Sequence, residues 1–168
     1  MDYAQNELGI VKSMPIYTEA ASAQRFADIA RIYKTNNSIT ADSLANTGLW
    51  LVTVEKNWSL NNGSIAGDSI TGIFTSASNS GVIAKDGTNS VNGPTGIPSG
   101  QKKLGMRYSG SSLEAFSDGS WSTPGSFDGQ INFTTYIEFG KEAACIIRDF
   151  AIWNQVNVTN SQVLEIIS

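Results

Sequence analysis

Histidine is absent from this sequence of 168 residues, cysteine occurs once, and only 15% of the residues are charged. The absence of histidine excludes Ser-His-Asp and Cys-His catalytic arrangements and the usual zinc sites. A single cysteine excludes an intrachain disulfide, so stability must come from packing. Because Cys145 lies in the apolar run 143–147, we interpret it as a small buried hydrophobe, not a nucleophile.

Basic clusters and long apolar runs are also missing. The net charge is −4 and no Lys/Arg stripe is present, which argues against a nucleic-acid partner. No apolar stretch approaches the ~20 residues that span a bilayer, so we expect no membrane insertion. The N-terminus has neither the basic start nor the apolar segment of a secretory signal peptide. We therefore expect a soluble protein that is made in the cytoplasm.

Ser, Thr, Asn and Gly replace the missing charge, a composition typical of strands joined by many turns. Residues 48–55 are rich in β-branched and aromatic side chains, and alternation places Trp50, Val52 and Val54 on one face. The residues between 86 and 100 predict a loop. Further strand-like segments are residues 69–75, 82–84, 103–108, 112–116, 131–139 and 144–153.

Turn and capping signals add local detail. Residues 109–111 and 117–120 each read as the turn of a hairpin. Thr159 and Gln162 have the spacing of a capping box, and Val158 and Val163 can form the hydrophobic staple around it, so a short helix is predicted at the C-terminus.

Many short strands, Gly-rich turns and little helix predict an all-β sandwich or barrel. Trp50 and Trp153 are predicted to be buried. Trp58 and Trp121 both sit beside turns, and the sequence leaves their burial open. On propensity alone, residues 20–32 could form an amphipathic helix.

Four segments, taken in order, resemble the concanavalin A-like (laminin G-like) jelly-roll domains of bacteriophage tail fibres and tail proteins. Residues 15–30 are similar to the opening of such domains, and residues 145–154 to their closing strand. Residues 104–119 are similar to a hairpin of the family, and residues 135–140 to the strand that follows it.

The resemblance implies a two-sheet antiparallel jelly-roll sandwich over residues 14–168, with a short C-terminal helix. Residues 1–13 would then be a linker or arm, in which Leu8, Ile10 and Val11 are otherwise unexplained. Residues 26–33 would form the first strand of the jelly roll, not a helix.

A catalytic function is one hypothesis, because the fold that the resemblance implies also hosts glycoside hydrolases and lyases. Retaining hydrolysis needs two carboxyl groups about 5 Å apart. Glu55, Glu114, Glu138 and Glu142 have no acidic neighbours at strand spacing, although carboxylates from different strands could still meet. We expect no enzymatic activity.

A calcium site is conceivable in residues 86–93, where Asp86 and Asn89 offer oxygen donors. Tight turns require the same residue types, and only Asp86 in this loop is charged, so any affinity for Ca²⁺ would be low. No other cofactor is expected.

Sugar binding needs an exposed aromatic face together with amide and carboxylate groups. Two turns offer such a set: Trp58 with Asn61 and Asn62, and Asp118 with Trp121. Turns collect Asn and Asp for structural reasons as well, so both interpretations stay open.

The resemblance implies a receptor-binding domain of a phage tail fibre, located in the virion, that recognises surface polysaccharide or lipopolysaccharide of a bacterial host. Such fibres are usually trimeric, and a homotrimer would multiply weak contacts. The alternative is a structural virion domain, for trimerisation or decoration, that binds protein. A polysaccharide depolymerase is a third hypothesis, and it would need acidic side chains that converge in a cleft.

Overall fold

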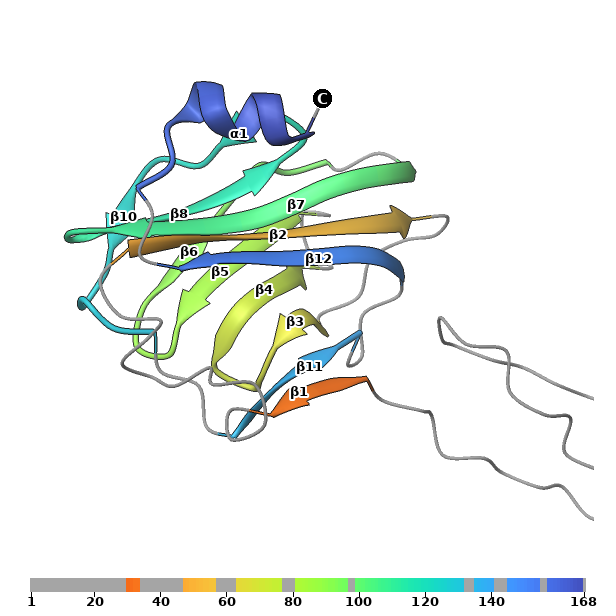
Figure 1. The fold of residues 1–168 in the computed structure, drawn as a ribbon, viewed down its shortest axis with the longest axis horizontal. Coiled ribbons are helices and arrows are strands. Elements are labelled where there is room, and N and C mark those ends of the chain that lie inside the picture. Colours follow the sequence, from red (N-terminus) through yellow and green to blue (C-terminus); the bar gives the residue numbers. More distant parts are fainter. Residues whose placement is uncertain are drawn as a thin grey trace, which may run out of the picture.

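The computed structural model describes residues 30–33, 47–56, 63–76, 81–96, 99–131, 135–140, 145–154 and 157–167. In this part of the chain, two antiparallel β-sheets enclose a shared apolar core, and one C-terminal helix lies outside them (Figure 1). This confirms the predicted two-sheet antiparallel sandwich with a short C-terminal helix.

The first sheet contains, in spatial order, β1 (Arg31–Tyr33), β11 (Tyr136–Phe139), β3 (Gly63–Gly67), β4 (Thr71–Ser76), β5 (Gly81–Asp86) and β6 (Ser90–Asn92). The second sheet contains β10 (Gly125–Ser126), β8 (Ser112–Ser117), β7 (Gly100–Ser109), β2 (Thr47–Lys56) and β12 (Ile146–Asn154), and β9 (Ser120–Trp121) pairs with β8. The helix α1 spans Asn160–Ile167.

Both predicted hairpins are present, and each has a two-residue turn. Ser109 pairs with Ser112 around a turn whose first residue, Gly110, has a φ of 61°. Ser117 pairs with Ser120 around Asp118 and Gly119, which have φ angles of 44° and 89°. In this second turn, positive φ at both central residues matches the right-handed twist of the flanking strands.

Strand β2 shows why the core forms where it does. Trp50, Val52 and Val54 point into the space between the sheets and are buried, as their alternation predicted. Leu49 and Leu51 point to the opposite side and belong to a second apolar cluster. The second sheet is therefore covered on both faces, which is unusual for a sheet at the outside of a sandwich.

Several predicted boundaries were wrong. The predicted loop 86–100 contains strand β6, and the predicted strand 131–139 begins only at Tyr136 within the described residues. Residues 31–33 are a strand, so the helical interpretation of residues 20–32 is wrong at its end. Residues 26–29 lie outside the described part of the chain.

Trp153 was predicted to be buried, but it is only partly buried. It lies opposite Leu49 on the outer side of β12. Within the described residues β12 pairs with a neighbour along one edge only, so the indole is covered from one side.

The predicted arm, residues 1–13, lies outside the described residues. Among the helices that the structure describes, none is long and apolar enough to cross a membrane.

Candidate functional site

The outer face of the second sheet is covered by helix α1 (Figure 1). Val163 of the helix and Val158, which precedes it, are both buried, as expected for the hydrophobic staple. The apolar cluster under the helix contains Leu49, Leu51, Phe116, Val158 and Val163, with Trp121, Trp153 and Ile167 packed against it.

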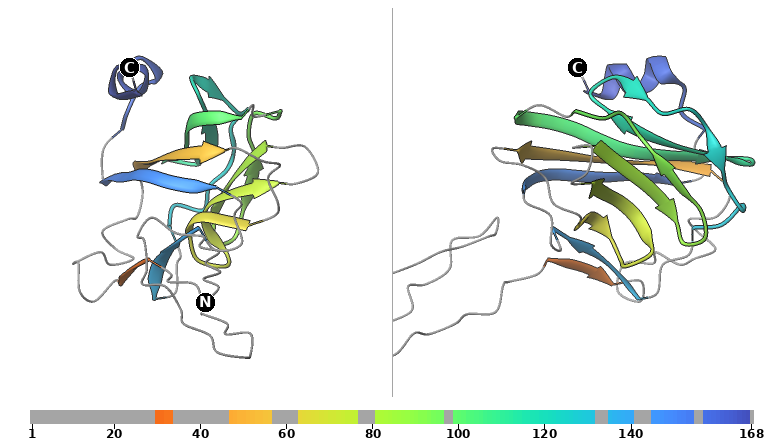
Figure 2. Two further views of the ribbon diagram at one scale, coloured as in Figure 1. Left: turned by 90° about the vertical axis from the view of Figure 1, so that its right-hand side faces the viewer. Right: turned by 180° about the vertical axis from the view of Figure 1, so that it is seen from behind.

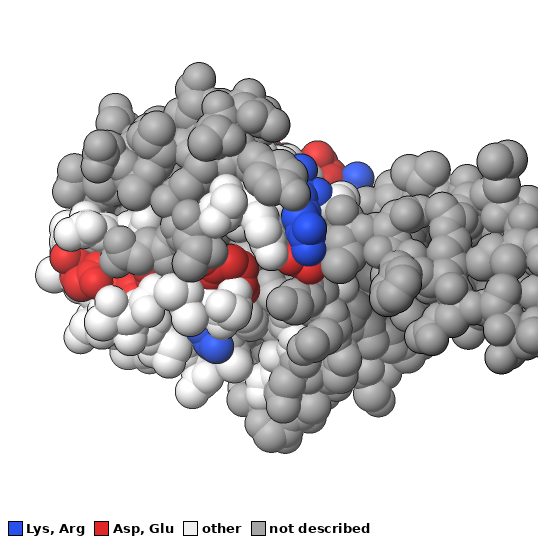
Figure 3. Space-filling model, turned by 90° about the horizontal axis from the view of Figure 1, so that it is seen from below, with Lys and Arg blue, Asp and Glu red and all other residues white. Residues whose placement is uncertain are grey.

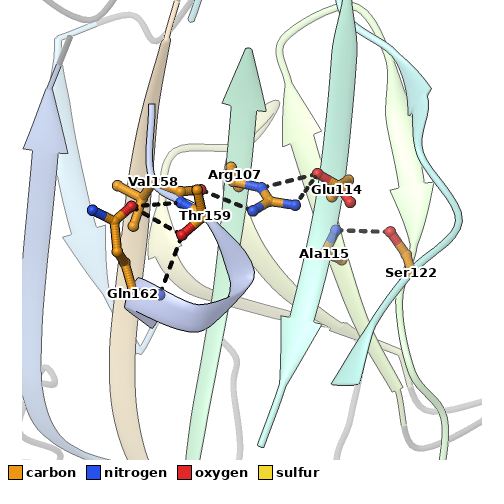
Figure 4. A network of polar contacts seen from close by, with 7 residues as sticks. All are labelled: Arg107, Glu114, Ala115, Ser122, Val158, Thr159 and Gln162. Atoms are coloured by element: carbon orange, nitrogen blue, oxygen red, sulfur yellow. Dashed lines mark hydrogen bonds and ion pairs between the residues drawn. The ribbon is translucent and has the colours of Figure 1, made fainter. Parts of the chain in front are cut away.

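Polar contacts hold this helix in place, and Arg107 is their centre (Figure 4). Its Nε and Nη2 donate to Glu114 Oε2 at 2.9 and 2.7 Å, and its Nη1 donates to the carbonyl oxygen of Val158 at 2.8 Å. Arg107 and Glu114 are directly opposite each other on β7 and β8. The Arg107 guanidinium therefore links strands β7 and β8 to Val158, in the segment that leads into α1.

Both ends of α1 are also satisfied. The backbone N–H of Thr159 donates to Gln162 Oε1 at 2.9 Å, and the N–H of Gln162 donates to Thr159 Oγ1 at 3.3 Å, which confirms the predicted capping box. At the other end, Lys103 Nζ donates to the carbonyl oxygen of Ile167. Helix α1 therefore covers the outer face of the second sheet and is held there by contacts within the chain.

Trp121 and Asp118, one of the two predicted sugar-binding sets, lie at the edge of this closed face. Trp121 is half-buried: its ring packs on Phe116, and the Arg107 guanidinium lies 4.1 Å from its centroid. Asp118 accepts a hydrogen bond from the N–H of Lys103 at 2.8 Å and pairs with Lys102 at 2.8 Å. Both side chains have contacts that stabilise the second hairpin, and their predicted role in sugar binding stays a prediction.

The other predicted set, Trp58 with Asn61 and Asn62, lies outside the described residues. These residues precede strand β3 directly in the sequence.

Asp86 and Asn89, the candidate calcium ligands, are brought together in the turn after β5. Asp86 Oδ1 accepts from the N–H groups of Thr88 and Asn89 at 2.8 and 2.6 Å, and its Oδ2 accepts from Asn89 Nδ2 at 3.0 Å. Both carboxylate oxygens are therefore used by the turn. In the described ranges, no group of three or more Asp, Glu, His or Cys residues could hold a metal.

Cys145 is partly buried and packs against the main core. Burial raises the pKa of its thiol from 9.0 to about 11. A thiol with this pKa is almost entirely protonated at neutral pH and a poor nucleophile, as the sequence predicted.

The outer face of the first sheet has a different character. Five backbone pairings place one residue from every strand in a continuous row (strands in Figure 2, right). The row runs Arg31, Glu138, Gly67, Gly72, Lys85 and Ser90. Neighbours such as Ile137, Ile73 and Ala84 belong to the core, so the row itself faces outward.

Two glycines divide this row. Gly67 and Gly72 lie side by side between Glu138 and Lys85, with φ angles of 149° and 130°. Three strand spacings separate Glu138 from Lys85, about 14 Å. Both glycines are buried, and because they carry no side chain, nothing but backbone separates Glu138 from Lys85 along the row.

Two buried polar atoms on this face lack a hydrogen-bond partner. Glu138 is 2% exposed; its Oε2 meets Arg31 at 3.4 Å, while its Oε1 has no partner within the described part of the chain. Ser64 is 5% exposed and its Oγ also has none there. Ser64 is on β3, three residues before Gly67, with a β-bulge between them. Since most buried polar groups in proteins are paired, these two atoms require an explanation.

Cations cover the aromatic rings of the same face. The Arg31 guanidinium lies 4.4 Å from the centroid of Tyr136, and Lys85 Nζ lies 4.2 Å from that of Phe74. Seen from below, the described surface shows carboxylates and cations interspersed among uncharged residues, with no extended basic area (Figure 3).

Ser64, Glu138 and Lys85 were not recognised as candidates in the sequence. One signal was available: Glu138 is the only charged residue of β11, whose other residues are aromatic or aliphatic.

Comparison with known proteins identifies the fold. No family model and no curated protein sequence matches the chain. A Bacteroides ovatus protein described as carbohydrate binding superposes with a TM-score of 0.63 at 9% identity, over 82% of this chain and 43% of that one. The jelly-roll sandwich is thereby established.

Two further similar structures are domains in complex with sugars. Domain 4 of the arabinanase AbnA from Geobacillus stearothermophilus, with arabinotriose, has a TM-score of 0.55 and 13% identity, over 74% of this chain and 68% of that one. The CBM40 domain of a Ruminococcus gnavus sialidase, with α2,3-sialyllactose, has a TM-score of 0.55 and 5% identity, over 80% and 90%. At such identities the likeness establishes the fold alone.

Proposed function

We propose that this chain is a non-catalytic carbohydrate-binding domain whose sugar site is the outer face of the first sheet. The observation that carries the proposal is the pair of unpartnered polar atoms, Glu138 Oε1 and Ser64 Oγ, on that face. Leaving a buried acceptor unpaired costs about 1–3 kcal/mol, so a ligand that pairs with these atoms would recover that free energy.

A sugar has the chemistry to satisfy both atoms. Its hydroxyl groups donate and accept hydrogen bonds, and a few well-placed polar groups are enough to orient it. The glycine pair Gly67 and Gly72 places no side chain beside Glu138. The jelly-roll domains solved with arabinotriose and sialyllactose support the proposal, because this fold is able to bind oligosaccharides.

The more specific proposal is a receptor-binding domain of a phage tail fibre that recognises surface polysaccharide or lipopolysaccharide of a bacterial host. It rests on the sequence resemblance of residues 15–30 and 145–154 to phage tail domains. A homotrimeric fibre would present three sites and strengthen weak single-site binding by avidity.

The proposed absence of catalysis rests on the missing histidine and on the lack of acidic neighbours at strand spacing around Glu55, Glu114, Glu138 and Glu142. A depolymerase would release reducing ends from the bound polysaccharide, and we expect none.

The experiment is a glycan-array and host-cell binding assay with the wild type, followed by a reducing-end assay on every polysaccharide that binds. We expect binding to bacterial surface glycans and no release of reducing ends. The Trp58→Ala, Trp121→Ala double variant, compared in parallel, reports whether the two turns contribute. Failure of the folded wild type to bind any glycan or host cell would refute the proposal.

One observation favours the structural alternative. Leu164 and Ile166 on α1 are 47% and 42% exposed, and exposed aliphatic side chains are available for contact with a protein partner. If glycan binding fails, a protein partner at this helix becomes the better hypothesis.

A further inference from the structure

We infer that the site on the first sheet selects uncharged, hydroxyl-rich sugars over acidic ones, with Glu138 as the acceptor for a sugar hydroxyl and Ser64 as a second contact. This inference rests on the proposed function and names the ligand class of the same site. It follows from which polar groups on this face lack a hydrogen-bond partner and from which charged groups already contact other residues.

The free atom on this face is an acceptor. An ionised carboxylate only accepts hydrogen bonds, so Glu138 Oε1 requires a donor such as a hydroxyl group. A sugar carboxylate at the same place would set two negative charges against each other where water is largely excluded, which is strongly unfavourable. The hydroxyl group of Ser64 can both donate and accept a hydrogen bond, so it can pair with a sugar hydroxyl in either role.

The cations of the face are already engaged. Arg31 contacts Glu138 Oε2 and stacks on Tyr136, and Lys85 lies over Phe74. An acidic sugar would have to detach one of them from its ring. The same two cations lie over the rings of Tyr136 and Phe74, on which a sugar could otherwise stack. Recognition of the sugar therefore depends on hydrogen bonds to Glu138 and Ser64.

Access to the site requires side-chain movement, because Glu138, Ser64 and the two glycines are all buried. Arg31 is one of the side chains over Glu138: it is 33% exposed and contacts the Glu138 carboxylate at 3.4 Å. Changes of side-chain rotamer on binding are common even where the backbone stays fixed.

The test is titration calorimetry with pairs of neutral and acidic probes. Lactose is compared with α2,3-sialyllactose, which adds one sialic acid residue, and galacto-oligosaccharides are compared with galacturonic acid oligosaccharides, which carry a carboxylate on each residue. The glycans that bind on the array are tested in the same way, each against its uronic or sialylated counterpart. The variants are Glu138→Gln and Ser64→Ala. Matched controls are Glu165→Gln on α1 and Ser126→Ala on β10, both exposed and distant in the fold.

We expect the neutral member of each pair that binds to bind about tenfold more tightly or better. Glu138→Gln is expected to weaken neutral-sugar binding by about 10- to 100-fold, and Ser64→Ala by about tenfold, while the controls stay within about twofold. Ser64→Ala removes an unpaired hydroxyl, so its Tm should stay equal to that of the wild type or rise, which separates loss of binding from loss of folding.

Tighter binding of the acidic members, or full binding by the folded Ser64→Ala variant, would overturn the inference and leave sugar binding standing. If Glu138→Gln does not fold, the affinity of the Ser64→Ala variant for the neutral sugar tests the inference by itself. Absence of binding to any glycan would instead refute the proposed function itself.

Discussion

The hydroxyl group of Tyr108 occupies the space that a Cβ atom on Gly48 would need. The two residues face each other across β7 and β2, and Tyr108 is fully buried. The carbonyl oxygen of Trp153 closes the same space from the other side. Gly48 is therefore required for close packing between a tyrosine and the neighbouring strand.

Gly48→Ala is expected to lower the free energy of unfolding by about 1–3 kcal/mol, because the added methyl group has no room. Tyr108→Phe removes the nearest atom, and the double variant should recover part of the loss. Urea denaturation of the single and double variants measures both effects. Full stability of Gly48→Ala would contradict the account of this packing.

The fold could be predicted where its signals are local. Thr159 and Gln162 lie three residues apart and specify the helix start without any tertiary contact. Trp50, Val52 and Val54 follow a simple alternation. By contrast, β3 was missed because Gly63–Gly67 has one β-branched residue, and its stability comes from pairing with β4 and β11.

The candidate site could not be predicted, because it depends on register between distant segments. Arg31, Gly67 and Glu138 are neighbours only after β11 inserts between β1 and β3. The turns that the sequence did single out, at Asp86 and Asp118, use their carboxylates to hold the backbone. An Asp in a turn looks the same in the sequence whether it binds a ligand or its own loop.

Arg107→Met is expected to lower the free energy of unfolding by about 2–4 kcal/mol. Partly buried Glu114 loses its ion-pair partner, and the carbonyl oxygen of Val158, before α1, loses its hydrogen bond. Trp121 should become more exposed, with a red shift in its fluorescence. The control is Arg148→Met: that ion pair with Glu55 is on the surface, so its loss should cost less than about 1 kcal/mol. Equal losses in the two variants would argue against Arg107 as the centre of the network.

Alkylation of Cys145 by iodoacetamide is expected to accelerate up to about pH 11 in the folded protein, because burial raises the pKa of this thiol to about 11. In urea the rate should level off near pH 9. The raised pKa means that the folded state holds this proton more tightly than the unfolded chain. The resulting contribution to stability is therefore full below pH 9 and is lost as the pH rises towards 11. A folded-state rate that levels off near pH 9 would contradict burial of the thiol.

Calcium is expected to leave the thermal stability unchanged, since both carboxylate oxygens of Asp86 accept hydrogen bonds within their own turn. Asp86→Ala should lower the free energy of unfolding by about 2–3 kcal/mol, and Asp86→Asn by less, because the amide oxygen can still accept from the backbone. Melting curves with CaCl₂ and with EDTA check the first point. A Tm that rises with CaCl₂ would show that the turn binds the ion.

The central claim, a sugar site on the outer face of the first sheet, is tested most directly by mapping amide chemical shifts by NMR during titration with a glycan that binds on the array. The account predicts shifts in β3, β4, β5 and β11, strongest around Ser64, Gly67 and Glu138, with α1 and the Asp118 turn unchanged. Chemical-shift changes concentrated at the Asp118–Trp121 hairpin or on α1, without changes in the first sheet, would contradict this account.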